Sequence, residues 1–187
     1  MVKKIKSCVF ISGKCSNLKS IIKNSREYNF PIKIVLIISN NINAYGLNYA
    51  KKYNIPYKVF NSNNRNLFER NCLIELKKRK IRFLCLAGFM MILSKKFINN
   101  FGYKILNIHP SLLPKFKGIN TFKRVLKSNE KYSGCTVHYV TQKVDSGNII
   151  MQKKILIKEK ETEKSLKNKV LKQEHILYPR AIRSIFK

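Results

Sequence analysis

A carboxamide and an imidazole stand two positions apart in the stretch of residues 105–114. Asn107 and His109 alternate with apolar residues of a strand, so both side chains project from the same face. Pro110 removes a backbone donor and cannot continue a central strand, so the chain leaves the sheet directly after His109, where α/β proteins keep their ligand sites. The pair predicts an amide donor working beside a titratable group, although a His before a Pro can also simply end a strand.

A second candidate site is the polar loop at residues 12–17, which reads Ser-Gly-Lys-Cys-Ser-Asn. It follows a buried apolar run and precedes a segment with apolar residues at helical spacing. A helix N-terminus presents backbone N–H groups to the loop before it, and Ser16 or Asn17 can cap that helix or bond a phosphate oxygen. The loop fits a phosphate monoester site and equally well an ordinary helix N-cap.

Two further loops carry residues of interest. The apolar loop at residues 88–93 follows a strand at 83–87 and predicts either a pocket wall for a flat aromatic ligand or core beneath the next helix. Asp145 lies in a loop between two β-rich runs, and an Asp before Ser-Gly is by default a turn former.

The elements that must position these residues follow an α/β pattern. Apolar runs of strand length alternate with helical segments through the first two thirds of the chain, which predicts a parallel sheet with right-handed crossovers. The β-rich runs at 135–141 and 149–157 are joined by a loop containing Gly and predict an antiparallel hairpin. A closing helix is expected over 162–175, with Pro179 interrupting it before 182–186. The prediction is a single-domain Rossmann-like sheet, mostly parallel, with helices on both faces, a C-terminal antiparallel hairpin and a closing helix.

Length and composition set the broad class. A chain of 187 residues with 44% hydrophobic residues builds one sizeable core, and none of its apolar runs could span a bilayer. The basic start at residues 1–6 resembles a signal peptide, but the apolar run behind it is short and reads as a first strand, so we expect a cytoplasmic protein. The five cysteines form no C-x-x-C pair, which argues against a disulfide framework and a zinc site and predicts reduced thiols and no metal.

A net charge of +30 invites a nucleic-acid function, because lysines near phosphates release counterions. The lysines are spread along the whole chain, together with an excess of Asn and Ile, which is typical of a coding bias. We therefore expect weak, salt-dependent binding to polyanions and no specific nucleic-acid partner.

Several stretches together resemble the phosphoribosylglycinamide formyltransferase family. They cover nearly the whole chain in order, and the string Asn-x-His-Pro-Ser-Leu-Leu-Pro with a later Asp is specific to formyl-folate transferases and hydrolases. The phosphate loop and the single-domain length select this family among them. The stretches are residues 11–18, 86–90, 106–114, 137–145 and 173–179.

The resemblance implies transfer of a formyl group from the co-substrate 10-formyltetrahydrofolate to the amine of glycinamide ribonucleotide in de novo purine synthesis. One formyltransferase domain would span residues 1–187, with a nucleotide-phosphate half over about 1–100 and a catalytic and folate half over about 101–187. Both implied partners are small molecules, with no membrane partner, and the sequence gives no oligomeric state.

The resemblance also implies roles for individual residues. Asn107 and a protonated His109 would donate to the charge that develops on the formyl oxygen. Asp145 would raise the pKa of His109 and help to relay the proton of the amine. His138 is expected to support the site and His175 to be structural. The implied binding residues are Cys15, Ser16 and Asn17 for the phosphate, Glu174 for the sugar, and Arg65, Met90, Met91, Ile92, Leu93 and Asn107 for the folate.

Three positions depart from the family pattern. Cys15 and Ser146 stand where Gly is common, and Met91 stands where Arg is common. We expect retained activity with weakened binding, because Asn107 and His109 are unchanged.

Three alternatives remain open. A methionyl-tRNA formyltransferase catalytic domain would suit the basic charge but normally carries a C-terminal tRNA domain. A formyltetrahydrofolate hydrolase normally carries an N-terminal regulatory domain. A basic nucleic-acid-binding module, from a different class, predicts salt-sensitive binding that survives loss of His109.

Overall fold

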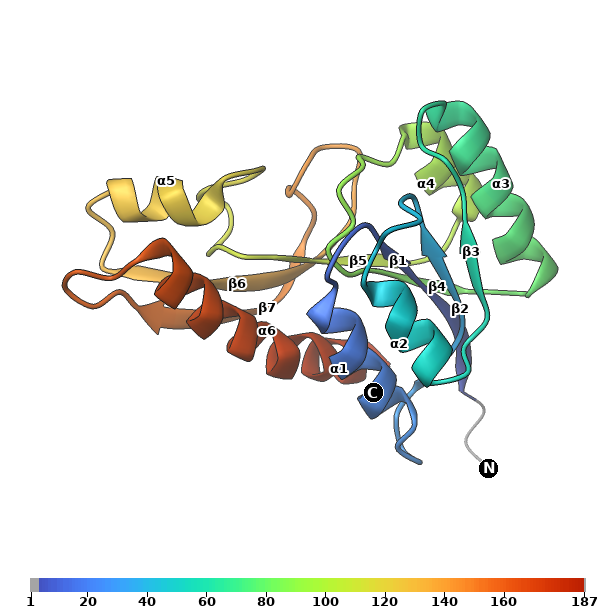
Figure 1. Ribbon diagram of the computed structural model, residues 1–187, viewed down its shortest axis with the longest axis horizontal. Helices are drawn as coiled ribbons and strands as arrows, with labels where there is room; N and C mark the ends of the chain where they lie inside the picture. The colour runs from blue at the N-terminus through green and yellow to red at the C-terminus, as the bar shows by residue number, and fades with distance from the viewer. Residues whose placement is uncertain (1–3, 187) are drawn as a thin grey trace.

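The computed structural model describes residues 4–186; residues 1–3 of the basic start and residue 187 lie outside this range. Seven strands form one sheet (Figure 1). The strands are β1 (Ile5–Ile11), β2 (Ile32–Ser39), β3 (Tyr57–Val59), β4 (Phe83–Leu86), β5 (Ile105–His109), β6 (Tyr132–Tyr139) and β7 (Ile149–Leu156). The helices are α1 (Ser16–Ser25), α2 (Gly46–Lys52), α3 (Arg65–Lys78), α4 (Lys95–Phe101), α5 (Thr121–Lys127) and α6 (Glu163–Ser184).

The strand order is β3-β2-β1-β4-β5-β6-β7. The first five strands in this order run parallel, β6 pairs antiparallel with β5, and β7 pairs antiparallel with β6. The mostly parallel sheet with a C-terminal antiparallel hairpin is therefore confirmed.

Helices cover both faces of the sheet, as Figure 1 shows, with α1, α2 and α6 on one face and α3 and α4 on the other. Strand residues alternate between two cores, so Val9 and Cys85 pack under the first group while Cys8 and Leu84 pack under the second. All four residues of β4 are buried, which explains why the central strands read as continuous apolar runs.

The closing helix differs from the prediction, because α6 continues through Pro179 to Ser184. Pro179 has no N–H to donate to the carbonyl of His175, one turn earlier. The Ser20 hydroxyl of α1 donates to that carbonyl instead, at 2.5 Å. Burial of Ala181 and Ile182 in the core then favours a helix that continues past the proline.

The strand order reverses between β1 and β4, and α/β proteins bind ligands beyond the carboxyl ends of the strands at such a point. The two loops that leave these strands are joined there. The Ser12 N–H donates to the Gly88 carbonyl at 3.2 Å, and the Met90 N–H donates to Ser12 Oγ at 2.9 Å. The predicted phosphate loop and the apolar loop at 88–93 therefore lie side by side where the strand order reverses.

Two features are absent from residues 4–186. No helix there is long and apolar enough to cross a membrane. No group of three or more His, Cys, Asp or Glu side chains is arranged to hold a metal ion.

Candidate active site

The predicted pair lies on β5, whose observed bounds agree with the sequence prediction. Antiparallel pairing with β6 places Asn107 opposite His138 and His109 opposite Thr136. His138 thereby joins the pair through strand register, a long-range relation that neither strand's sequence states by itself.

Both ring nitrogens of His109 face acceptors. Nδ1 lies 3.2 Å from Oδ2 of Asp145, and Nε2 lies 2.9 Å from the carbonyl oxygen of Phe116. The ring is buried, with 5% of the residue exposed. The pairing of His109 with Asp145, which the resemblance implied, is present in the structure. The Phe116 carbonyl had no sequence signal, because any residue type supplies one.

The pKa of His109 corrects one expectation. Burial lowers this pKa below its ordinary value, and this effect outweighs the Phe116 carbonyl and the Asp145 carboxylate, which both raise it. Asp145 therefore supports the charged ring, as predicted, but does not hold the pKa of His109 above its ordinary value.

Asp145 is the only aspartate of the sequence and is more than a turn former. Its Oδ2 accepts the Gly118 N–H at 2.9 Å, and its Oδ1 lies 3.5 Å from Nε2 of His138. Burial raises the pKa of this carboxyl, but His138, the Gly118 N–H and His109 together lower it below its ordinary value. Its backbone has a φ of 46°, in the left-handed region where non-glycine residues concentrate at functional sites. The carboxylate is therefore held as an anion.

The amide of Asn107 donates within the same cluster. Its Nδ2 lies 3.2 Å from His138 Nε2 and 3.5 Å from Asp145 Oδ1. Nδ1 of His138 lies 2.8 Å from the carbonyl oxygen of Tyr139, and Nε2 lies between the Asn107 amide and the Asp145 carboxylate. This position is compatible with the supporting role expected for His138. The second N–H of Asn107 has only the long contact with Asp145, so this donor is available to a ligand.

The polar loop before α1 corrects the capping prediction. The N-cap residue is Cys15, and neither Ser16 nor Asn17 caps the helix with its side chain. Cys15 has a φ of 54°, which explains why glycine suits this position. Its Sγ accepts the Gly13 N–H at 3.3 Å, so the sulfur occupies one of the backbone donors that a phosphate would use.

Asn17 points away from the loop toward α6. Its side chain is buried, and its Nδ2 donates to Oε2 of Glu174 at 2.7 Å. Burial raises the pKa of Glu174 to about 7, although the Asn17 bond lowers it. Two of the predicted substrate residues, far apart in the sequence, therefore form one buried pair.

The apolar loop at 88–93 is divided between the core and the surface, and Leu93 confirms the prediction of core beneath the next helix. Met90 and Ile92 are 77% and 57% exposed and form an open apolar surface. Leu93 is 4% exposed and packs in the core with Phe97, while Met91 is partly buried against the same core. The side chain of Leu93 therefore does not face the open surface where a ligand would lie. Arg65, in the first turn of α3, is exposed.

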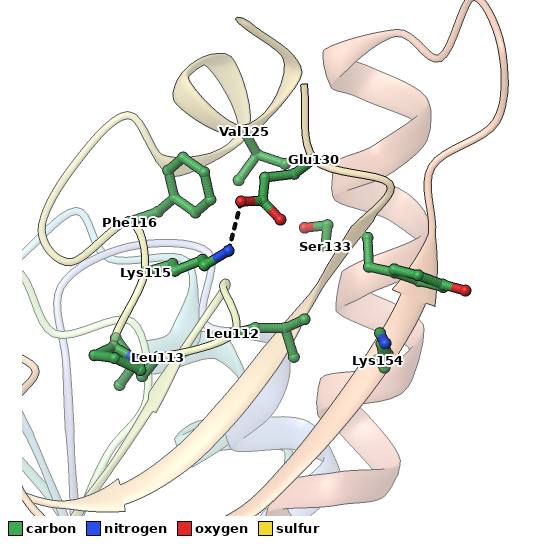
Figure 2. Close-up of a pocket in the computed structure, with 10 residues that line it drawn as sticks. Leu112, Leu113, Lys115, Phe116, Val125, Glu130, Ser133 and Lys154 are labelled. Atoms are coloured by element: carbon green, nitrogen blue, oxygen red, sulfur yellow. Dashed lines mark hydrogen bonds and ion pairs between the residues drawn. The ribbon is translucent and has the colours of Figure 1, made fainter. Parts of the chain in front are cut away.

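A cavity of about 310 Å³ lies beside this site (Figure 2). Its wall includes the segment 112–116, but neither Asn107, His109 nor Asp145 lines it. The ion pair of Lys115 and Glu130, with 2.6 Å between Nζ and Oε1, lies at its edge. The cavity shares the Phe116 segment with the candidate site and is otherwise separate from it.

Comparison with known proteins gives the class. The family model described as formyl transferase matches residues 5–182, so the chain belongs to the formyl transferase family and is an enzyme of the formyltransferase type. The phosphoribosylglycinamide formyltransferase of Haemophilus influenzae is 40% identical over 95% of this chain and 85% of its own length.

Similarity extends to longer proteins and to solved structures. The trifunctional purine biosynthetic protein adenosine-3 of Homo sapiens is 40% identical over 98% of this chain, which spans 18% of that protein. The crystal structure of phosphoribosylglycinamide formyltransferase from Brucella melitensis is 38% identical and covers 98% of this chain and 96% of its own, with a TM-score of 0.93.

Proposed function

We propose that this enzyme transfers a formyl group from 10-formyltetrahydrofolate to the primary amine of glycinamide ribonucleotide, a step of purine synthesis. The observation that carries the proposal is the convergence of Asn107, His109 and Asp145 at the carboxyl end of β5. The names of similar proteins support the acceptor. The folate donor rests on the family resemblance together with the apolar surface at Met90 and Ile92.

The reaction is a direct displacement at the formyl carbon. The amine nitrogen forms a bond to this carbon, negative charge develops on the formyl oxygen, and the bond to N10 of the folate then breaks. Asn107 supplies one donor to the charged oxygen through its second N–H, and His109 supplies another. Asp145 relays the proton from the amine to N10 through water.

His109 can donate to substrate only after its Nε2 leaves the Phe116 carbonyl, at 2.9 Å in this structure. The negatively charged formyl oxygen then takes the place of the neutral Phe116 carbonyl as the acceptor. This change favours the protonated form of His109, which burial disfavours. Substrate binding is therefore expected to raise the pKa of His109 relative to the free enzyme.

The loops at residues 12–17 and 88–93 are the main binding surfaces in this proposal. The helix N-terminus at Cys15 and Ser16 holds the phosphate. Glu174, oriented by Asn17, holds sugar hydroxyls. The folate ring lies against Met90 and Ile92, while Arg65 pairs with a carboxylate of the folate tail.

The cellular setting is part of the same proposal. All five cysteines are buried free thiols, which fits the reducing cytoplasm.

The nucleotide-phosphate half and the catalytic half share one continuous sheet, which is consistent with a single domain.

A formyl-transfer assay tests the proposal. Purified protein is given 10-formyltetrahydrofolate with either glycinamide ribonucleotide or charged initiator tRNA, and turnover of the ribonucleotide alone is expected. Asn107→Ala should abolish it, whereas Asn100→Ala, an exposed position on α4, should not. Folded protein that formylates only the tRNA, or neither acceptor, would contradict the proposal.

A further inference from the structure

A buried carboxylate on α3 lies outside the cluster around His109. Glu69 is 5% exposed and contacts Arg65 and Ser94, the residue that directly follows the loop at 88–93. We propose that Glu69 is a positioning residue for the formyl donor, which holds the loop at 88–93 and the Arg65 side chain in a fixed relation. This inference rests on the proposed function, because it assigns the loop and Arg65 to the folate.

Glu69 receives hydrogen bonds from two segments. Oε1 accepts the Ser94 N–H at 2.7 Å and the Nε–H of Arg65 at 3.3 Å. Oε2 accepts the Ser94 hydroxyl. One carboxylate therefore joins the end of the loop to the arginine.

Ser94 is the residue at which the loop becomes α4. Its Oγ accepts the Phe97 N–H at 3.0 Å and so caps the helix. Because the hydroxyl proton is directed to Glu69, the oxygen keeps a lone pair for the cap. Glu69 thus determines where the loop ends as well as how the helix begins.

The other end of the loop is fixed separately. The Met90 N–H donates to Ser12, and the Phe89 ring stacks on Phe68 with 5.9 Å between centroids. Phe68 directly precedes Glu69, so adjacent residues of α3 hold the two ends of the loop. Met90 and Ile92 remain exposed between these anchors, and a flat ligand would meet a preorganised surface.

The contact of Glu69 with Arg65 orients the arginine side chain more than it stabilises the fold. The Arg65 side chain is 46% exposed, and an ion pair with such an exposed partner contributes little to folding. Glu69 engages Nε, which leaves the terminal N–H groups free for a bidentate contact with a carboxylate. The structure therefore gives Glu69 a role in orienting a ligand contact.

The same helix supplies a matched control. Arg79 Nε lies 3.2 Å from Glu75 Oε2, an ion pair of the same type and spacing at the opposite end of α3. Glu75→Gln removes an ion pair like that removed by Glu69→Gln without touching the loop.

The experiment compares the two variants by steady-state kinetics and by calorimetric binding of 5-formyltetrahydrofolate as a probe. Glu69→Gln should raise both KM for the formyl donor and Kd for the probe about tenfold, the loss expected for charged hydrogen bonds. KM for the ribonucleotide and kcat should stay within about twofold. Glu75→Gln should match wild type, and Glu69→Asp should recover part of the loss because it keeps the charge.

Two sets of outcomes would overturn the inference. Equal probe affinity for Glu69→Gln and Glu75→Gln would contradict the positioning role. A Glu69→Gln variant with a lower kcat and a raised KM for both substrates would contradict it as well. Neither result affects the proposed function, provided that the wild-type protein turns over. Wild-type protein that neither binds the probe nor turns over contradicts the proposed function as well. If Glu69→Gln does not fold, Arg65→Ala and Ser94→Ala must each weaken probe binding, and unchanged binding in either variant refutes the inference.

Discussion

Two carboxyl groups at the candidate site have opposite pKa shifts. Asp145, in the loop between β6 and β7, faces His109, His138 and the Gly118 N–H, and its pKa is lowered. Glu174, on α6, has the Asn17 amide as its donor, and its pKa is raised to about 7.

The difference lies in the donors that surround each group and in the depth of burial, because Asp145 is partly exposed and Glu174 is buried. Burial raises the pKa of both carboxyls, and only the group with several donors and two histidines overcomes this effect. The hairpin end of the site therefore holds a fixed negative charge beside His109. The α1–α6 face holds a carboxyl whose pKa is raised to about 7.

Asp145→Asn should have the largest effect on this comparison. The amide keeps the shape but removes the negative charge that stabilises a protonated His109 in its buried position. We expect kcat to fall about a hundredfold or more, a loss typical of removing charge stabilisation in a transition state. The apparent pKa assigned to His109 should also move lower, because the raising contribution of Asp145 is lost.

The measurement is kcat against pH, with Glu130→Gln as the control because Glu130 pairs with Lys115 beside the site. The control should keep both the rate and the pH profile. Full activity with an unchanged profile in Asp145→Asn would exclude the pairing of Asp145 with His109 as a catalytic device.

Glu174→Gln should change how stability depends on pH. Because folding raises the pKa of Glu174, the folded state binds the proton more tightly, and stability falls as pH rises from the ordinary pKa to about 7. The variant lacks this loss. Relative to Glu174→Gln, wild type should lose about 3 kcal/mol of unfolding free energy over that range, from 1.36 kcal/mol per pH unit. Urea unfolding at pH 5 and pH 8 measures it.

Asn17→Ala sharpens the same prediction. It removes the donor that lowers the pKa of Glu174, so the pH at which stability is lost should move upward. Asp145 predicts the opposite slope, since a lowered pKa gives stability that is lost as pH falls. A free-energy difference between wild type and Glu174→Gln that is the same at both pH values would show that Glu174 is not perturbed.

Local patterns predicted the elements that depend on local sequence. Residues 105–109 formed a strand because apolar residues precede a proline. The bond from Ser20 that allows α6 to pass Pro179 comes from another helix, so local sequence wrongly ended the helix there.

The sequence predicted which residues form the candidate site better than it predicted the contacts between them. Asn107 and His109 followed from strand alternation, and Asp145 became their partner only through the family resemblance. The Phe116 carbonyl and the Gly118 N–H are backbone groups that leave no mark in the residue types. The balance of burial against donors that lowers the pKa of His109 depends on packing around the ring and could be known only from the fold.

Cys15→Gly should give the smallest effect, and it tests whether the phosphate end of the site is weakened by its own side chain. The change frees the Gly13 N–H from Sγ and removes a left-handed non-glycine residue, at the loss of a partly apolar core contact. We expect KM for the ribonucleotide to fall about threefold, a gain of less than one hydrogen bond's typical net contribution, with kcat unchanged.

Cys15→Ala separates the two causes, because it removes the sulfur but keeps the strained backbone. If the sulfur is the obstacle, Cys15→Ala and Cys15→Gly should lower KM equally; if backbone strain is, only Cys15→Gly should. A KM that neither variant lowers would mean that the Gly13 N–H does not meet the phosphate. The side chain of Cys15 would then not limit phosphate binding at the loop before α1.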